Sequence, residues 1–243
     1  MNSYVMAAFR EPLSAFTYVL KGKDSLIKKK IGDALSVPAS EINKYYQEIS
    51  KLDFIEPGSK IENIGQIASP EILYVICRIL KPNIVVETGV ASGLSSAYIL
   101  KALSMNSKGK LISIDMPNYE EELVKVSSDY LDTPQAIIPK DKETGWVVPK
   151  NLRNRWTLKI GLVRETLIPA LEEAGEIDIF LHDSEHSYEN MMFEFENAWS
   201  HLKNGGVLLS HDITWNTSFM DFARKVNRRY TTLFFSGMGA IVK

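Results

Sequence analysis

Ionisable side chains gather directly after two short apolar runs in the last third of the chain. The first run, Ile177–Leu181, is followed by four of them: His182, Asp183, Glu185 and His186. The second run, Val207–Ser210, leads in the same way into His211 and Asp212. Carboxylates and imidazoles act as general bases, and they also bind divalent cations. Because charged groups require compensation when they converge, we expect a cation, a substrate or mutual hydrogen bonds to accompany them.

Both runs belong to a series of short, nearly continuous apolar segments, the pattern of parallel strands that are covered on both faces. The expected strands are Ile84–Glu87, Leu111–Asp115, Trp156–Ile160, Ile177–Leu181, Val207–Ser210, Thr231–Phe235 and Gly239–Val242. Helical patterns separate most of them, at Leu94–Ser104, at Glu165–Glu173, within Tyr188–Leu202 and at Phe219–Tyr230. The short connection between the last two strands allows only an antiparallel hairpin. The alternation predicts a doubly wound, Rossmann-like α/β sheet of seven strands.

The chain is expected to divide into a helical cap over residues 1–65 and a main domain over residues 66–243. Mixed helical patterns interrupted by prolines characterise the cap. A helix over Pro70–Leu80 leads the chain into the first strand of the main domain. The connection 117–155 is unusually long and carries a lone Trp146. Because connections of this length are uncommon unless they cover a site, we predict a lid-like insertion there.

The overall composition limits the partners. The formal net charge of -2 gives no basic footprint for nucleic acid or for an anionic membrane. No apolar stretch has the length and flanks of a signal peptide or a membrane-spanning helix. Cys77 is the only cysteine, so an internal disulfide is excluded, and its apolar neighbours predict a buried, inert thiol. We therefore expect a cytoplasmic protein without nucleic-acid or membrane partners.

The turn after the first expected strand points to a small cationic ligand. In the turn Gly89–Gly93 the two glycines lie four positions apart, so the G-x-G-x-x-G fingerprint of a dinucleotide site is absent. The Glu87 carboxylate before it would repel a phosphate but suits an ammonium or sulfonium group. Asp115 ends the second strand and can accept hydrogen bonds from both hydroxyls of a ribose. S-adenosylmethionine carries the ribose and both cationic groups, and no phosphate.

With these features the chain resembles the class I S-adenosylmethionine-dependent methyltransferases over about residues 65 to 243. The resemblance rests on Val86–Gly93, on Asp115 and on Asn204–Val207 before the fifth strand. The subgroup looks like the small-molecule O-methyltransferases that modify sugars and antibiotics, as three further segments indicate: Gly145–Pro149, Phe180–Tyr188 and Ser210–Asp212. The resemblance implies the class I methyltransferase fold, S-adenosylmethionine as the methyl donor and a hydroxylated small molecule as the acceptor.

The resemblance also implies which residues bind the donor. These are Glu87, Thr88, Gly89, Ser92, Gly93, Asp115, Gly161 and Asp183. Glu87 and the glycine turn are expected to hold the methionine part of the donor. Asp115 is expected to hold the ribose, and Gly161, just after the third strand, to flank the adenine.

Metal-assisted relatives bind Mg²⁺ through carboxylates after the fourth and fifth strands. By position, Asp183 and Asp212 match these ligands, and Glu185 matches the base that takes the proton from the acceptor. His211 stands where relatives carry an acid, and imidazole prefers softer transition metals to Mg²⁺. The expected cation, Mg²⁺ or another divalent ion, is therefore left open, with Asp183, His211 and Asp212 as its ligands. His186 competes with Glu185 as the base, so the expected catalytic set is Glu185, His186 and Asp183.

Other functions share parts of this pattern. An N-methyltransferase acting on a small molecule or a protein would have the same fold, as would a non-catalytic module that only binds the donor. A NAD-dependent dehydrogenase would need the pyrophosphate fingerprint and a parallel sixth strand, and the sequence has neither. The sequence leaves open which molecule accepts the methyl group and whether the chain forms a homo-oligomer.

Overall fold

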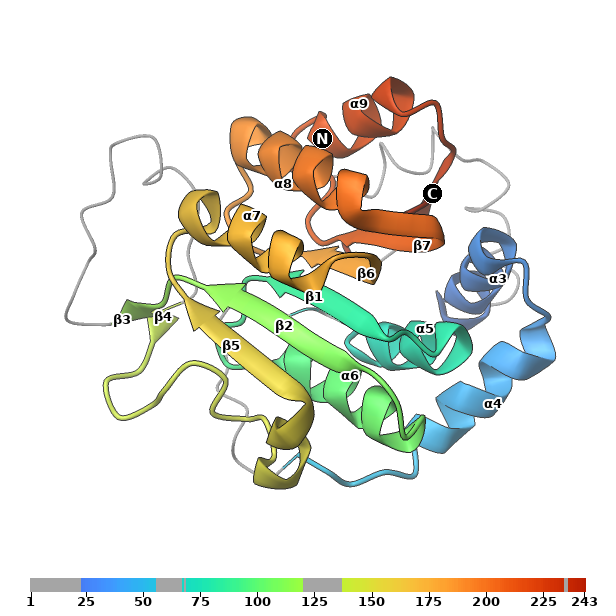
Figure 1. Cartoon of the computed structure of the whole chain (residues 1–243). Coiled ribbons are helices and arrows are strands. Elements are labelled where there is room, and N and C mark those ends of the chain that lie inside the picture. The colour runs from blue at the N-terminus through green and yellow to red at the C-terminus, as the bar shows by residue number, and fades with distance from the viewer. Residues whose placement is uncertain (1–22, 56–66, 68, 120–136, 234–235) are drawn as a thin grey trace.

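The computed structural model describes residues 23–55, 67, 69–119, 137–233 and 236–243. Seven strands form one sheet in the order β5-β2-β1-β6-β7-β9-β8 (Figure 1). Their bounds are β1 Ile84–Thr88, β2 Lys110–Asp115, β5 Trp156–Ile160, β6 Ile177–His182, β7 Leu202–Ser210, β8 Tyr230–Leu233 and β9 Met238–Val242. The first five of these strands pair in parallel, and β9 pairs antiparallel with both β7 and β8. The predicted doubly wound sheet with a C-terminal hairpin is confirmed.

Helices cover both faces of the sheet (Figure 1). Their bounds are α3 Lys23–Leu35, α4 Ala39–Ile49, α5 Glu71–Leu80, α6 Leu94–Met105, α7 Val163–Ala174, α8 Tyr188–His201 and α9 Ser218–Lys225. One hydrophobic cluster packs the helices α3, α4, α5 and α6 against one face of the sheet. A second cluster packs α7, α8 and α9 against the other face.

Successive strand residues alternate between these two clusters. Val85 packs into the first cluster and Val86 into the second, while Ile179 and Phe180 do the same on β6. All four side chains are buried. This explains why the strands read as continuous apolar runs, because a parallel strand between two helical layers has no solvent-facing side.

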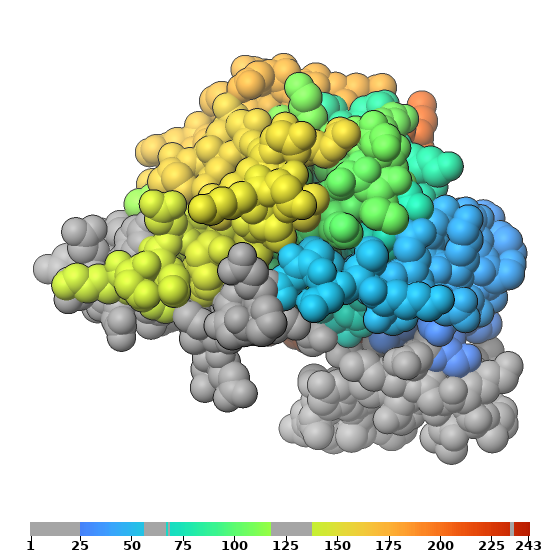
Figure 2. Space-filling view, turned by 90° about the horizontal axis from the view of Figure 1, so that it is seen from below, coloured from blue at the N-terminus to red at the C-terminus, as the bar shows by residue number. Residues whose placement is uncertain are grey.

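The two described N-terminal helices lie against the rest of the chain. Ile42, Tyr45 and Ile49 of α4 are buried in the same cluster as α5. An ion pair joins Arg78 Nε of α5 to Glu48 Oε1 of α4 at 2.7 Å. Figure 2, seen from below, shows the blue N-terminal helices beside the green segment that includes α6. The division into a cap over residues 1–65 and a main domain stays a prediction, and residues 1–22 and 56–66 lie outside the described part of the chain.

The last predicted helix was too long. Phe219–Tyr230 was expected to be helical, but α9 ends at Lys225, and Tyr230 already belongs to β8. Asn227 explains the difference, because its positive φ of 51° turns the chain out of the helix. β8 starts one residue earlier than predicted, and its expected end at residues 234–235 lies outside the described residues.

The connection 117–155 contains local structure that periodicity did not reveal. The strands β3 (Asn118–Tyr119) and β4 (Ile137–Ile138) pair in parallel, and a short 3-10 helix, η2, spans Lys150–Arg155. Residues 120–136 lie outside the described part of the chain, so the lid stays a prediction. Within the described residues, no helix is long and apolar enough to cross a membrane.

Candidate active site

The turn after β1 touches the end of β6 at the point where the strand order reverses. From β1 the chain continues outward to β2 and β5, and it then returns to β6 on the other side of β1. Open α/β sheets bind ligands in the crevice at this point. Gly89 has a φ of 81°, and a Cβ added there would lie 2.0 Å from the backbone oxygen of Asp183. Only glycine fits, so the predicted donor turn and the predicted acid–histidine group lie in direct contact.

Glu87 lies beneath this turn, fully buried. Its carboxylate accepts hydrogen bonds from three serine hydroxyls: Ser95 at 2.5 Å, Ser96 at 2.6 Å and Ser113 at 2.7 Å. Burial raises the pKa of Glu87 to about 7, although these hydroxyls act in the opposite direction. The carboxylate therefore fixes the start of α6 through these hydrogen bonds. Its expected contact with the donor stays a prediction.

Asp115 crosses from the end of β2 to the turn. Its Oδ1 accepts a hydrogen bond from the backbone N–H of Val90 at 3.1 Å, whereas its Oδ2 is buried without a hydrogen-bond partner among the described residues. Burial raises the pKa of Asp115 to about 6, against the backbone N–H groups of Val90 and Ala91 and the hydroxyl of Thr144. A buried carboxylate oxygen that lacks a donor is costly, and a ribose hydroxyl would supply one.

The segment after residue 143 closes onto the same turn. Backbone N–H groups of Gly145 and Val147 donate to the carbonyls of Ala91 and Ser92, at 2.9 and 3.0 Å. Thr144 precedes this contact, and its buried hydroxyl acts on the Asp115 carboxyl and lowers its pKa, although neither this hydroxyl nor Asp115 Oδ2 makes a hydrogen bond of regular geometry among the described residues. Thr144 is thus a candidate ligand contact that the sequence did not single out, since it lies in a connection without periodicity.

The other predicted donor positions have mixed surroundings. The Thr88 hydroxyl turns away from the turn and donates to Glu194 at 2.5 Å. Ser92 is buried beneath the 144–148 segment, and Gly93 starts α6 with a φ of 87°. The N–H of Gly161, just after β5, donates to the Asp115 carbonyl at 2.9 Å, which places Gly161 beside the predicted ribose contact.

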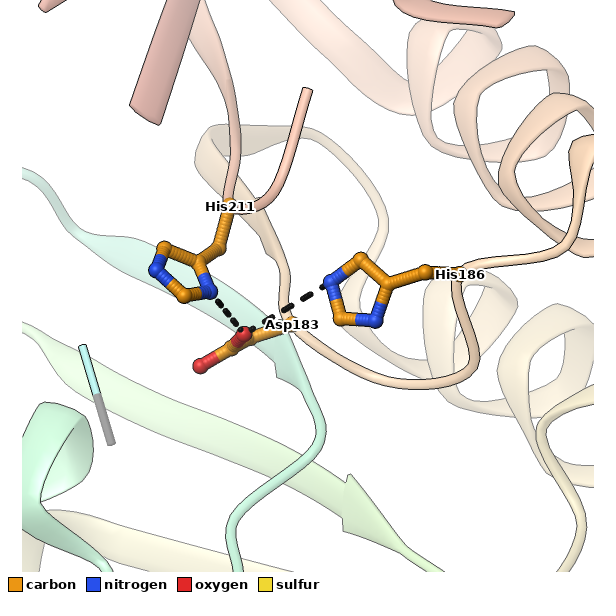
Figure 3. A group of neighbouring side chains, drawn as sticks. All are labelled: Asp183, His186 and His211. Atoms are coloured by element: carbon orange, nitrogen blue, oxygen red, sulfur yellow. Dashed lines mark ion pairs between the residues drawn. The ribbon is translucent and has the colours of Figure 1, made fainter. Parts of the chain in front are cut away.

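Asp183, His186 and His211 come together at the carboxyl ends of β6 and β7 (Figure 3). His211 Nδ1 lies 2.9 Å from Asp183 Oδ1, and His186 Nε2 lies 3.9 Å from the same oxygen. Asp212 stands at the side, with its Oδ2 3.5 Å from His211 Nδ1 and 4.0 Å from His186 Nε2. The structure thus joins the three predicted metal ligands in one place and adds His186 to them.

The two histidines have opposite electrostatic environments. Burial would lower the pKa of His211, but the adjacent Asp183 carboxylate, helped by Asp212, outweighs it and raises the pKa to about 9. His186 has no comparably close carboxylate. Burial, together with His182 and His211, lowers its pKa to about 2, so its imidazole is neutral at physiological pH.

We expect His211 to make stability depend on pH. Its pKa lies above the unfolded value near 6.5, so the ion pair with Asp183 stabilises fully below that pH and is lost as the pH rises through about 9. The loss amounts to at most about 3 kcal/mol. Urea unfolding at pH 6 and pH 9.5, with a chelator present, measures it. The His211→Gln variant should flatten the dependence and His201→Gln should keep it; equal slopes in all three proteins would contradict the assignment.

Glu185 belongs to the same loop but not to the His186–His211 group. Its Oε2 is buried without a hydrogen-bond partner among the described residues, and burial raises the pKa of its carboxyl. Ser187 and, at longer range, Arg164 act in the opposite direction. The two predicted bases, Glu185 and His186, are therefore close to Asp183 in sequence, but their side chains have different surroundings.

A buried network behind the site was not predicted. Glu194 of α8 accepts hydrogen bonds from Thr88, Ser184 and Asn190, and its Oε2 lies 2.7 Å from His182 Nδ1. The His182 ring in turn meets the His186 ring edge-on, with 5.0 Å between the ring centroids. The pairing depends on how α8 packs onto β6, which the sequence does not specify.

Comparison with known proteins agrees with the fold. A family model described as a methyltransferase domain matches residues 86–213, which is more than half of the chain. No curated protein matches the sequence significantly. Two solved structures share the fold at low sequence identity. An O-methyltransferase from Bacillus cereus in complex with SAH is 15% identical, with a TM-score of 0.50 over 89% of this chain and 97% of that one. A calicheamicin methyltransferase is 15% identical, with a TM-score of 0.52 over 84% of this chain and 91% of that one.

The fold is that of a Rossmann-like methyltransferase of class I. The chain belongs to the family of methyltransferase domains that the matching model describes. It is therefore a methyltransferase, as the sequence had predicted.

Proposed function

We propose that this methyltransferase transfers the methyl group of S-adenosylmethionine to a hydroxyl oxygen of a small molecule. The observation that carries the proposal is the contact between the turn at Gly89 and the backbone of Asp183. It brings the donor side of the crevice against a group of acids and histidines. A nucleophile held between the two would lie beside both the methyl group and the residues that can take its proton.

The donor is held mainly by the turn and by Asp115. Asp115 Oδ2 and the hydroxyl of Thr144 suit the ribose, because both are buried polar atoms that make no hydrogen bond of regular geometry among the described residues. Glu87 contributes from beneath, where its bonds to Ser95 and Ser96 fix the first turn of α6 against β1. Gly161 lies beside Asp115, to whose carbonyl its N–H donates at 2.9 Å, and the adenine would extend there.

The chain must align the acceptor and remove its proton. The sulfonium of the donor is already activated, so orientation of the hydroxyl toward the methyl group supplies much of the acceleration. Of the two predicted bases, Glu185 is the better suited. Burial raises the pKa of Glu185 toward the working pH, where a general base is most effective, and it lowers the pKa of His186 far below that pH.

A divalent cation fits the residues at the end of β6 and β7. Asp183 and His211 would hold it, with Asp212 beside them, since His211 Nδ1 lies 2.9 Å from Asp183 Oδ1 and 3.5 Å from Asp212 Oδ2. Such an ion lowers the pKa of a hydroxyl that it binds. Asp183 would also anchor the loop that carries Glu185, because its N–H donates to the Thr88 carbonyl at 2.9 Å.

The test is release of S-adenosylhomocysteine from the full chain with a panel of hydroxylated small molecules, among them phenols, catechols and sugars. We expect turnover with at least one of them, and a loss of about 10²-fold or more in kcat for Glu185→Gln at saturating donor. Glu189→Gln, which alters an exposed acid at the start of α8, is the matched control. Turnover with matched amines alone would favour N-methylation, and donor binding without any product would favour a non-catalytic module.

A further inference from the structure

We propose that Asp183, His186 and His211 form a three-ligand site for a divalent transition-metal ion, and that this site discriminates against Mg²⁺. The inference deepens the proposed function, on which it rests for the role of the ion. Binding itself is independent of turnover, and it follows from the geometry, burial and chemistry of the three side chains.

The distances between the ligand atoms suit one ion. The atoms offered by the three residues all lie within 4.8 Å of one another. Ligands bound at about 2.1 Å lie about 3.0 Å apart when adjacent at a right angle, and about 4.2 Å apart when opposite. The separation of 2.9 Å between His211 Nδ1 and Asp183 Oδ1 is close to the right-angle value, and that of 3.9 Å between His186 Nε2 and the same oxygen lies between the two values.

The ion pair between His211 and Asp183 does not explain why the His186 ring is buried beside them. His211 and Asp183 satisfy each other, but His186 Nε2 has no hydrogen-bond partner among the described residues. Only 9% of the His186 side chain is exposed, so water does not readily compensate this nitrogen. Figure 3 shows that the rings of His186 and His211 turn a nitrogen toward the Asp183 carboxylate from two sides. An ion between them would give the buried nitrogen its partner.

The backbone also contributes to the position of the His211 ring. With Nδ1 directed at Asp183, its ring makes a further hydrogen bond to the backbone of Ser236. Histidines that bind metals commonly donate their other N–H to a backbone carbonyl, which sets the tautomer and the ring orientation. A hydrogen bond of this kind would help to keep His211 Nδ1 directed at Asp183 when an ion binds.

The chemistry of the three ligands determines which kind of ion the site prefers. Mg²⁺ prefers oxygen ligands and keeps several waters, whereas imidazole nitrogen suits Zn²⁺, Co²⁺, Ni²⁺ and Fe²⁺. Two of the three ligands here are imidazoles. Asp212 adds a second carboxylate at the side, so two negative charges offset the double charge of the ion.

Titration of the metal-free full chain with Co²⁺ tests the site, because the visible absorption of Co²⁺ changes in position and intensity when protein ligands replace water, and the histidine variants identify those ligands. We expect a saturable band that a hundred-fold excess of Mg²⁺ leaves unchanged. His186→Ala and His211→Ala should each weaken Co²⁺ binding by about ten-fold or more. His201→Ala is the matched control, since His201 contacts Asn197 of its own helix instead. His186→Gln replaces His186→Ala if the latter fails to fold, as judged by circular dichroism.

Three results would overturn the proposal: no Co²⁺ band in the wild-type chain, full displacement of Co²⁺ by Mg²⁺, or unchanged Co²⁺ affinity in a folded His186 variant. None of them depends on methyl transfer. A chain that binds Co²⁺ through His186 but methylates no hydroxyl would therefore refute the proposed function and keep the metal site.

Discussion

Gly89→Ala will destabilise the folded chain by about 3 kcal/mol or more and abolish donor binding. The added Cβ would lie 2.0 Å from the Asp183 carbonyl oxygen and 2.5 Å from its carbon, and backbone atoms cannot move aside as a flexible side chain does. The positive φ of 81° adds strain for any residue with a Cβ. Relief requires β1 and β6 to separate at the switch point, where the donor is expected to bind. Urea unfolding and calorimetric titration with S-adenosylmethionine measure the two effects.

Gly205→Ala separates the cost of backbone strain from the cost of the close contact of the added Cβ. Gly205 has a similar φ of 78°, but a Cβ there meets no atom within 4 Å. We expect it to cost only about 1 to 2 kcal/mol, the strain of the backbone alone. If Gly89→Ala is no more destabilising than Gly205→Ala, the close contact between the turn and Asp183 does not exist in solution.

Asp183→Asn will lower kcat by about 10²- to 10³-fold. The amide keeps the shape of the side chain but removes the charge that faces His211 at 2.9 Å, and it is a poor ligand for a cation. Saturating donor in the assay separates this loss from any change in donor affinity. Asp221→Asn, at an exposed ion pair with Arg224 on α9, serves as the control. Full turnover of the Asp183 variant, with and without a chelator, would remove Asp183 from the catalytic set.

The sequence predicted the sheet because parallel strands between two helical layers are apolar on both faces. It also predicted that Asp183, His211 and Asp212 converge, since the carboxyl ends of β6 and β7 must meet at one edge. Both predictions depend only on chain order and strand direction. For the same reason the short connection after β8 was enough to predict an antiparallel partner.

Side-chain directions at the site were beyond the sequence. Nothing in the pattern indicates that Glu87 turns inward to three serines, one of which comes from β2. The pairing of Glu194 with His182 depends on how α8 rotates against the sheet, and the periodicity of α8 marks only its buried side. Thr144 lies in a segment without periodicity. The end of α9 depends on the left-handed backbone conformation of Asn227, which asparagine tolerates but does not always adopt.

The central claim is that S-adenosylmethionine binds at the turn after β1, with Asp115 on its ribose. Calorimetric titration of the full chain tests it most directly, with wild type, Asp115→Asn and the exposed-site control Asp141→Asn side by side. We predict saturable heat with S-adenosylmethionine and none with NAD. We also predict an affinity at least about ten-fold weaker in Asp115→Asn, because the ribose loses a charge-assisted hydrogen bond. Absence of binding in the wild type, or an unchanged affinity in folded Asp115→Asn, would contradict it.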